Sequence, residues 1–391
     1  MPLPSGYRDC FPGLAGDWAR FDGPAGTQMV DVAIDATAAF SRSGANANSH
    51  GFFDAARQVD ELMDRARASV GALLGGDPAG VVFGPSTTNL LFGLTRAIAR
   101  QLQPGDEIVV TQLDHDANVT PWRLAAADAG ASVATAKIDA ATGTLPVDAV
   151  ASLITPRTRW VAVTGASNAV GTIPDVPSIA GAVHAAGARL LADAVHLAPH
   201  RLIDVVALGC DALATSSYKW YGPHAAALWI EPALLESLDA YRVRPAPSTG
   251  PGKFETGTPA FETIAGVDAA ARFVTGIGLA TIRAAEEAVF APLLEGLQSE
   301  DGVEVYGLPS LEGRTPTVAF NVRGQTADEV ARALARDRIA VWSGDYYAVE
   351  IMAALGLDTR GGAVRAGVSS YNTPDDVDRL LASVRALTRS G

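Results

Sequence analysis

Cysteine is nearly absent from this sequence. Cys10 and Cys210 are the only 2 cysteines in 391 residues. They lie far apart, and neither belongs to a CxxC motif or to a cysteine–histidine spacing, so the sequence indicates neither a disulfide framework nor a zinc site. We expect no bound metal and ordinary buried thiols at both positions.

Lysine is also scarce. Lys137, Lys219 and Lys253 are the only lysines among 30 basic residues, so few side chains can act as an amine nucleophile. Acidic residues outnumber basic ones, and a formal net charge of −13 would repel a nucleic acid or an anionic membrane over most of the surface. We therefore expect no nucleic-acid partner.

Long hydrophobic runs are missing as well. The first residues, MPLPSGYRDCFPG, lack the basic segment and the apolar core of a signal peptide, and apolar runs such as 225–230 are too short to cross a bilayer. The composition, with 48% hydrophobic and 19% charged residues, is that of a globular protein. The sequence predicts a cytoplasmic protein without a membrane partner.

Apolar runs alternate with helical periodicity from about residue 60 to residue 230, which is typical of α/β proteins. Short apolar strands suit a mostly parallel sheet that is buried on both faces. The strands predicted here are 81–83, 107–111, 132–137, 160–164, 189–192, 212–215 and 225–230, and the helices are 60–74, 88–102 and 178–186.

A stretch rich in proline and glycine, 245–259, interrupts this pattern and indicates a domain boundary. We expect an N-terminal segment and a large domain over 1–260, and a smaller α+β domain over 261–391. For the smaller domain the sequence predicts a long helical region at 262–299, strands at 317–322 and 339–341, and helices at 327–336 and 374–388.

Two strand ends carry candidate catalytic residues. Lys219, in TSSYKWYG, follows a predicted strand, where partial desolvation would leave its amine unprotonated part of the time, as a Schiff-base lysine requires. Asp193 ends another strand, and a buried aspartate there can keep a pyridine nitrogen protonated. The alternatives are a surface lysine and a helix N-cap. Together the two residues point to pyridoxal 5′-phosphate (PLP).

Three further segments could complete such a site. Ser86, Thr87 and Thr88 lie where a strand turns into a helix, and a helix N-terminus favours a phosphate, although a plain N-cap would have the same residues. His115 follows another strand and could stack on the cofactor ring, and His196 could bind its 3-oxygen. The alternative for either histidine is a structural or surface position in a loop.

Taken together, these segments resemble the class V aminotransferase family, in particular its cysteine desulfurase and selenocysteine lyase group. The resemblance begins at FDGPAGTQ, runs through STTN, DHDANVTPW, ASNAVGT, ADAVH, SSYKWYGPH and KFETGTP, and reaches VRAGVSSYNTPDDVDRL near the C-terminus. It implies the fold of fold-type I PLP-dependent transferases, with a mostly parallel seven-stranded sheet in the large domain, and a homodimer with shared active sites.

The resemblance also implies roles for individual residues. Lys219 resembles the lysine that carries PLP, Asp193 the partner of the ring nitrogen, and His115 the stacking histidine. Thr258 resembles a residue that reaches the phosphate of the neighbouring subunit, and Arg365 resembles the arginine that binds the substrate carboxylate, a role that a bidentate guanidinium suits. The other positions that match cofactor contacts are Thr87, Thr88, Asn168, His196, Ser216 and Tyr218, although the family often has histidine at the place of Tyr218 and usually glutamine at that of His196.

The segment VWSGDYYA, 341–348, departs from the family pattern. Desulfurases of the similar group carry their persulfide-forming cysteine in this loop, and alignment of the Gly344 turn puts Tyr347 in its place. Trp342 replaces an arginine of the same loop. We therefore expect no persulfide chemistry, and substrate contacts from Trp342 and Tyr347; the alternative for these aromatic residues is simple loop packing.

The sequence thus predicts a PLP-dependent lyase or transferase that acts on an amino acid or a cysteine conjugate. Cleavage of a C–S or C–Se bond at Cβ is the preferred reaction. Decarboxylation with oxidative deamination, epimerisation and amino transfer would use the same residues and stay open as alternatives. An alternative of another class is a catalytically silent scaffold.

Overall fold

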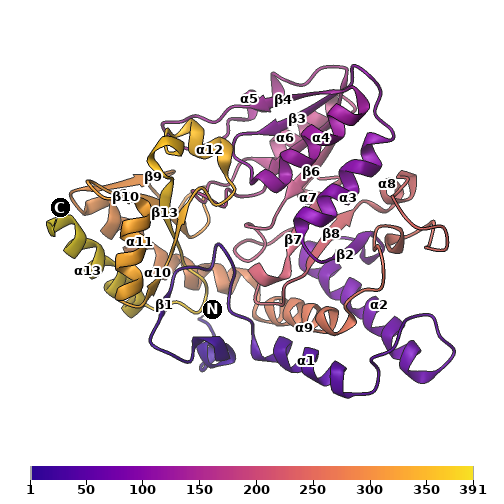
Figure 1. The fold of residues 1–391 in the computed structure, drawn as a ribbon, viewed down its shortest axis with the longest axis horizontal. Coiled ribbons are helices and arrows are strands. Elements are labelled where there is room, and N and C mark those ends of the chain that lie inside the picture. The colour runs from indigo at the N-terminus through magenta and orange to yellow at the C-terminus, as the bar shows by residue number, and fades with distance from the viewer. Residues whose placement is uncertain (1, 391) are drawn as a thin grey trace.

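Seven strands form the central sheet of the larger part of the molecule (Figure 1). The computed structural model describes residues 2–390. The strand order is β2–β8–β7–β6–β5–β3–β4, and β8 alone runs against the others, so the predicted mostly parallel sheet is confirmed. The strands are β2 (Val81–Gly84), β3 (Glu107–Thr111), β4 (Ser132–Ala136), β5 (Thr158–Thr164), β6 (Arg189–Asp193), β7 (Ala212–Ser216) and β8 (Ala226–Ile230).

Successive residues of these strands enter two different hydrophobic cores. Val161 and Val163 of β5 pack with α2, α6 and α9, whereas Trp160 and Ala162 pack with α3, α4 and α8 on the other face. Burial on both faces explains why the middle of each central strand is apolar, while charged residues such as Glu107 and Arg189 stand at strand ends. The helices of this part are α1 (Asp31–Arg42), α2 (Asp54–Leu74), α3 (Thr87–Ala99), α4 (Thr120–Ala129), α5 (Val147–Ala151), α6 (Val176–Ala185), α7 (Val205–Leu208), α8 (Pro232–Ser237) and α9 (Phe261–Ile277).

A four-stranded antiparallel sheet, β12–β13–β10–β9, forms the smaller part. Helices α10, α11 and α13 supply the rest of its core, at the orange-to-yellow end of the chain in Figure 1. Strand β1 (Ala19–Arg20) pairs with β11 (Ile339–Ala340), so the N-terminal segment joins this part. The other elements are β9 (Val303–Tyr306), β10 (Thr317–Val322), β12 (Trp342–Gly344), β13 (Ala363–Gly367), α10 (Leu279–Ser299), α11 (Ala327–Arg336), α12 (Val349–Ala354) and α13 (Pro374–Ser390).

The predicted long helical region 262–299 consists of two helices. Gly278 has a φ of 84°, a backbone conformation that ends α9, and α10 leaves at an angle of 76° to it. Helix α9 packs against the large sheet and α10 against the small one, so we propose the domain boundary at Gly278 in place of residue 260. Within residues 2–390, no single helix has the length and apolar character of a membrane span. Helices α9 and α10 reach that length and apolar character only when they are taken together, across the bend.

Short 3₁₀ helices connect several elements, and some of them reach the site described below. Two that do so are η4 (Asp116–Asn118) and η5 (Ser217–Lys219), which contribute Ala117 and Lys219 to the lining of its cavity. The remaining 3₁₀ helices are η1 (Tyr7–Cys10), η2 (Pro12–Leu14), η3 (Pro78–Gly80), η6 (Pro251–Lys253) and η7 (Asp358–Arg360). Six of the seven strands of the large sheet run in one direction, so their carboxyl ends meet at one edge, where ligands of open α/β sheets bind.

Candidate active site

A cavity of about 450 Å³ opens at this edge of the sheet, between the large and the small part. Thr164, Asp193 and Ser216, the last residues of β5, β6 and β7, form its floor, and residues of β12 and β13 close the opposite side. Every candidate site residue except Thr258 lines it, namely Thr87, Thr88, His115, Asn168, Asp193, His196, Ser216, Tyr218, Lys219, Trp342, Tyr347 and Arg365.

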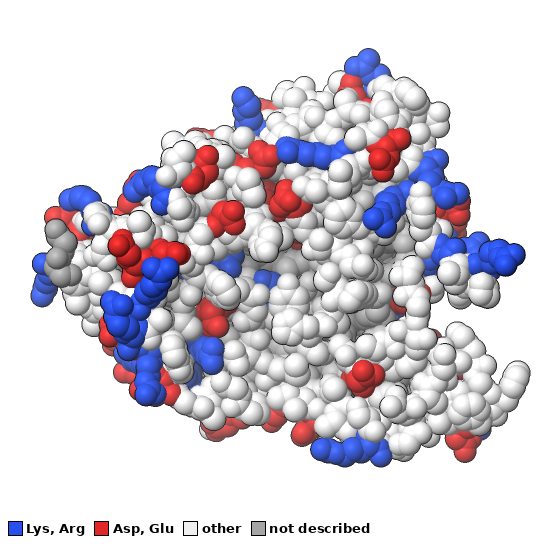
Figure 2. Space-filling model, viewed as in Figure 1, with Lys and Arg blue, Asp and Glu red and all other residues white. Residues whose placement is uncertain are grey.

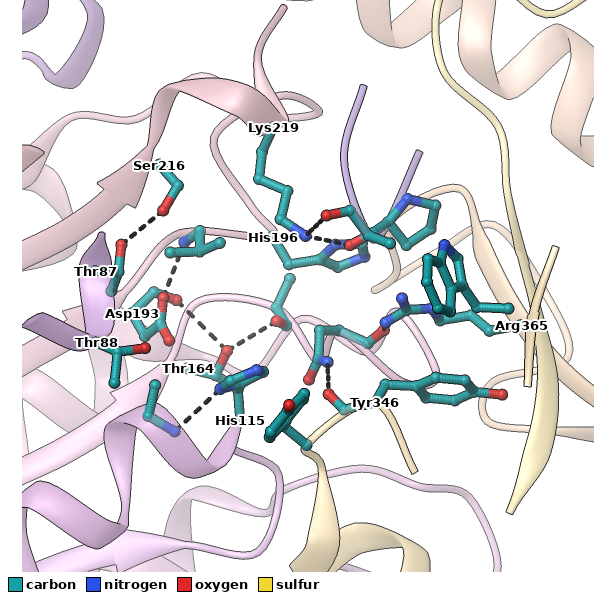
Figure 3. Close-up of a pocket in the computed structure, with 18 of the residues that line it drawn as sticks. Thr87, Thr88, His115, Thr164, Asp193, His196, Ser216, Lys219, Tyr346 and Arg365 are labelled. Atoms are coloured by element: carbon teal, nitrogen blue, oxygen red, sulfur yellow. Dashed lines mark hydrogen bonds between the residues drawn. The ribbon is translucent and has the colours of Figure 1, made fainter. Parts of the chain in front are cut away.

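Lys219 lies inside the protein, with 8% of its surface exposed. Its Nζ donates to the carbonyl oxygens of Pro24 and, at 2.9 Å, Ala25 (Figure 3). Burial, with the positive charge of Arg365, lowers the pKa of the amine from 10.5 to about 7. The surface-lysine alternative is therefore wrong, and the amine is neutral much of the time near neutral pH.

Asp193 is also buried, with 4% exposed. Its Oδ1 accepts a hydrogen bond from the backbone of Val195 at 2.9 Å, within a turn and not at the start of a helix, so the N-cap alternative is wrong. Burial raises the pKa of this carboxyl to about 6, while the charge of Lys219 acts in the opposite direction. A cationic partner in the cavity would stabilise the carboxylate form.

Hydroxyl groups gather at the N-terminus of α3. The Oγ1 of Thr87 and the Oγ of Ser216 lie 2.8 Å apart, and Thr88 lies beside them (Figure 3). Ser86 caps the helix by accepting from Asn89 N at 3.1 Å. Free N–H groups of the first helical turn and these hydroxyls together make a favourable site for a phosphate.

His115 faces the cavity in its neutral form. Burial, then the charges of Lys219 and Arg365, lower its pKa to about 4. Its Nδ1 accepts from Ala117 N at 3.0 Å, so a proton on the neutral ring resides on Nε2. The rings of His115 and Tyr347 are stacked, with centroids 5.6 Å apart and planes at 26°.

His196 has partners that the sequence did not indicate. Its Nε2 lies 3.1 Å from Thr317 Oγ1 and 3.2 Å from Thr315 Oγ1. Burial and the neighbouring His200 hold its pKa well below the usual range, so the ring is neutral. The two threonines come from the small part of the molecule and fix the orientation of this ring. Thr164 was missed too, although it ends β5 as Asp193 ends β6.

Arg365 is buried on β13, directly opposite Trp342 of β12. It donates to Asn168 O at 2.7 Å, and its guanidinium carbon lies 4.2 Å from the centre of the Tyr346 ring. Within residues 2–390, neither its Nε nor the Oδ1 of Asn168 has a hydrogen-bond partner. These two buried polar atoms therefore lack a counterpart that a ligand can provide.

Thr258 lies elsewhere, in a second cavity of about 300 Å³ that Phe83, His224 and Glu255 also line. The two cysteines are remote from the first cavity as well: Cys10 is partly exposed, and Cys210 is buried, which raises its pKa to about 12. No group of three or more metal-ligating side chains occurs in the described part of the chain.

The residues of the first cavity fit PLP. Lys219 supplies a buried, partly neutral amine, Asp193 a buried carboxylate with a single hydrogen bond, and the start of α3 a phosphate cradle. The unpartnered Oδ1 of Asn168 and the neutral rings of His115 and His196 surround the remaining space. Each chemical group of the cofactor thus has a matching side chain.

Comparisons with known proteins give the family. A model of the family described as "Aminotransferase class-V" matches residues 20–380. An uncharacterized protein of Mycobacterium tuberculosis is 33% identical over 97% of this chain and 98% of its own length, and a cysteine desulfurase of Cronobacter sakazakii is 31% identical over 95% and 93%.

Solved structures agree with these relatives. The apo cysteine desulfurase of Thermococcus onnurineus superposes with a TM-score of 0.92 at 26% identity, covering 100% of this chain and 99% of that one. The cysteine desulfurase CsdA of Escherichia coli gives 0.89 at 28% identity, covering 99% of each chain. The predicted fold-type I architecture is confirmed, and this chain belongs to the aminotransferase class-V family as a PLP-dependent enzyme related to cysteine desulfurases.

Proposed function

We propose that this enzyme is a C–S β-lyase that acts on a cysteine conjugate and forms no enzyme persulfide. The observation that carries the proposal is one cavity that contains both the buried Arg365, whose Nε is unpartnered within the described chain, and the ring of Tyr347. The family resemblance implies that Tyr347 takes the place of the persulfide-forming cysteine, which supports the absence of an enzyme persulfide. In Figure 3, Arg365 lies on the side of the cavity opposite Thr87 and Ser216, with Lys219 between them.

Each charged residue has a distinct task in this reaction. The guanidinium of Arg365 binds the substrate carboxylate, which satisfies its free N–H group. The amine of Lys219, with a pKa of about 7, accepts the proton from Cα. Bound PLP supplies an electron sink for the pair left at Cα. Asp193 holds the proton of the ring nitrogen, and this ion pair offsets the cost of burying the carboxylate.

The bond that breaks is the one between Cβ and sulfur. The electron pair from the Cα–H bond forms a Cα–Cβ double bond, and the thiolate leaves with the pair of the C–S bond. Hydrolysis of the remaining three-carbon unit yields pyruvate and ammonia. The proton on Lys219 can pass to the departing thiolate, so the residue is returned to its neutral state.

Persulfide formation needs a thiol beside the departing sulfur. Cys210 is buried among apolar side chains with a raised pKa, and Cys10 lies in the N-terminal segment; neither lines the cavity. Tyr347 occupies the loop position at the cavity and carries no sulfur. These positions support a reaction in which the sulfur leaves as a free thiol.

Product analysis tests the proposal. The holoenzyme is incubated with S-substituted cysteines and with free cysteine, and pyruvate, ammonia, carbon dioxide, thiol and sulfane sulfur are measured. Equal amounts of pyruvate, ammonia and thiol are expected. Carbon dioxide without pyruvate would contradict the lyase reaction and indicate a decarboxylase. Racemisation of the substrate would indicate an epimerase, and a keto acid formed only with an amino acceptor would indicate an aminotransferase. Formation of alanine together with protein-bound sulfane sulfur would show that the enzyme is a cysteine desulfurase.

A further inference from the structure

The wall of the cavity beside Arg365 is aromatic and partly open to solvent. We infer that Trp342, Tyr346 and Tyr347, called here the aromatic wall, form a subsite for a large, uncharged aromatic or apolar substituent on the substrate sulfur. This inference names a substrate class and so rests on the proposed lyase function. It starts from the exposure of Trp342 and Tyr347, which are 53% and 72% exposed although both line the cavity.

Exposed aromatic residues are costly unless something covers them. Large apolar side chains on a protein surface lose the gain of burial, and clusters of them mark ligand or partner sites. Trp342 and Tyr347 are exposed aromatic residues that border the described cavity, and the ring of Tyr346 lies against the guanidinium of Arg365. An apolar ligand group is the counterpart that this wall lacks.

The geometry of the wall relative to Arg365 fixes what reaches it. Trp342 is the cross-strand neighbour of Arg365, and the ring of Tyr346 covers the guanidinium at 4.2 Å. Tyr347 stacks on His115 at the other end of the wall. When the carboxylate of an amino acid is on Arg365, its amine directed to the cofactor and its Cα–H facing Lys219, one direction at Cα remains for the side chain. The aromatic wall borders that space.

The wall is held in place before any ligand binds. Tyr346 and Tyr347 have φ values of 55° and 58°, a left-handed conformation that non-glycine residues rarely adopt. Asn168 Nδ2 donates to the carbonyl of Tyr346 at 2.9 Å, and Asp116 N donates to that of Tyr347 at 2.7 Å. Both donors belong to the large part of the molecule. Backbone strain maintained by contacts across a cavity is characteristic of functional sites.

The charges around the wall determine which substituents fit. Lys219 and Arg365 are the only basic residues that line the described cavity, and both are assigned to other groups of the substrate and cofactor. Asp345, exposed at the wall, would repel an anionic substituent. In Figure 2 the hollow between the two parts is bordered mainly by white, uncharged residues. The subsite therefore favours aromatic substituents over carboxylate-bearing ones.

Binding of inert analogues tests the subsite without turnover. In 2-amino-5-phenylpentanoic acid a methylene replaces the sulfur of S-benzylcysteine, and norvaline is the matching analogue of S-methylcysteine; neither can undergo β-elimination of a thiol. Calorimetry on the holoenzyme is expected to show at least about tenfold tighter binding of the phenyl analogue, which corresponds to about 1.4 kcal/mol and lies within the contribution of an aromatic contact.

Variants locate the effect. Tyr347→Ala and Trp342→Ala should each lower the ratio of phenyl-analogue affinity to norvaline affinity. Tyr241 is an exposed aromatic residue outside the cavity, and Tyr241→Ala should keep the wild-type ratio. With S-benzylcysteine as substrate, the loss should appear in KM and not in kcat. Equal binding of both analogues, or a preference that survives Tyr347→Ala and Trp342→Ala, would overturn the inference.

The two proposals fail in different experiments. If the phenyl analogue binds through the aromatic wall but no conjugate releases thiol and pyruvate, the lyase reaction is wrong and the subsite stands. If S-methylcysteine and S-(carboxymethyl)cysteine are cleaved as well as S-benzylcysteine, the lyase reaction stands and the subsite is wrong. Both results come from the same holoenzyme preparation.

Discussion

At the scale of single residues, burial decides the chemistry of the site. Desolvation favours the neutral form of three side chains of the site. It is the largest cause of the lowered pKa values of Lys219 and His115 and of the raised pKa of Asp193. A solvent-exposed lysine would stay protonated at neutral pH, so it could neither form a Schiff base with an aldehyde nor accept a proton. The ends of buried strands provide this desolvation while the side chains still reach the cavity.

The assignment of the cofactor to Lys219 predicts a spectroscopic result. Lys219→Ala should abolish the visible absorbance of lysine-bound PLP that borohydride reduces, and with it the activity. Lys137 is exposed beyond the end of β4, outside the cavity, so Lys137→Ala serves as the control and should keep both. A reducible band that persists in Lys219→Ala would assign the cofactor to another lysine.

The lowered pKa of Lys219 also predicts a dependence of stability on pH in the cofactor-free chain. The pKa is 10.5 for an ordinary lysine and about 7 in the fold, so between these values the unfolded chain binds more protons. The free energy of unfolding therefore rises with pH over this window, by up to about 1.4 kcal/mol per pH unit from this residue.

Replacement of Lys219 by methionine removes the titrating amine and keeps a side chain of similar volume. Urea unfolding of the cofactor-free wild type and of Lys219→Met at pH 7, 8 and 9 should show the variant as the more stable protein at pH 7 and the difference shrinking as the pH rises. Parallel curves for the two proteins would mean that the amine is not desolvated.

At the scale of elements, a short loop joins the two parts of the molecule. Tyr346 and Tyr347 follow β12, and their carbonyl oxygens accept hydrogen bonds from Asn168 and from Asp116, which begins η4. The ring of Tyr347 adds a contact to His115. The loop therefore couples the position of β12 and β13 to the residues of the large part that line the cavity.

The left-handed backbone at Tyr347 predicts an unusual order of stabilities. Glycine adopts this conformation without steric cost, whereas alanine keeps the strain, so Tyr347→Gly should be more stable to urea than Tyr347→Ala by about 1 kcal/mol. Tyr241 lacks a positive φ, so the order of its alanine and glycine variants should be reversed. The same order at both positions would refute the strain at Tyr347.

The sequence predicted some elements far better than others, for physical reasons. Strands 107–111 and 317–322 match β3 and β10 because each contains a run of buried apolar residues, Ile108–Val110 and Val318–Phe320. Strand β13 was missed because Arg365 interrupts a short run of small residues. The bend at Gly278 was missed because a single glycine inside a helical pattern does not by itself end a helix.

The site could be predicted where it depends on strand ends and not where it depends on distant segments. Asp193 and Lys219 follow buried strands, so local sequence was informative for both. The contacts of His196 with Thr315 and Thr317 form only when the small part folds against the large one, so no local sequence pattern predicts them. The strained pair of tyrosines was visible in the sequence, but its backbone was not.

At the scale of the whole molecule, two compact parts share one cavity. The large sheet supplies the residues that match the cofactor, and the small sheet supplies Arg365 and the aromatic wall (Figures 1 and 3). The chain crosses between the parts at Gly278 and again through the N-terminal segment, where β1 pairs with β11. Substrate binding at the junction therefore depends on how the two parts are held together.

Thr258 lies outside this cavity, in the second one, and the family resemblance places its counterpart at the phosphate of a neighbouring subunit. We propose a homodimer in which each Thr258 completes the site of the other copy. Thr258→Glu would then put a negative charge beside the partner's phosphate and weaken PLP binding at least about tenfold, since a lost charge-assisted hydrogen bond alone costs about 1.5–3 kcal/mol.

Mixed dimers distinguish a shared site from a self-contained one. The Lys219→Ala chain lacks the amine but keeps Thr258. The Thr258→Glu chain keeps Lys219 but lacks the threonine. In a mixed dimer, one of the two sites combines an intact Lys219 from one chain with an intact Thr258 from the other. Mixing equal amounts of the inactive Lys219→Ala and the weakly active Thr258→Glu should therefore restore activity and tight PLP binding, to about a quarter of the wild-type level when the chains reassort at random. A mixture no more active than the average of its components would show that each chain forms its site alone.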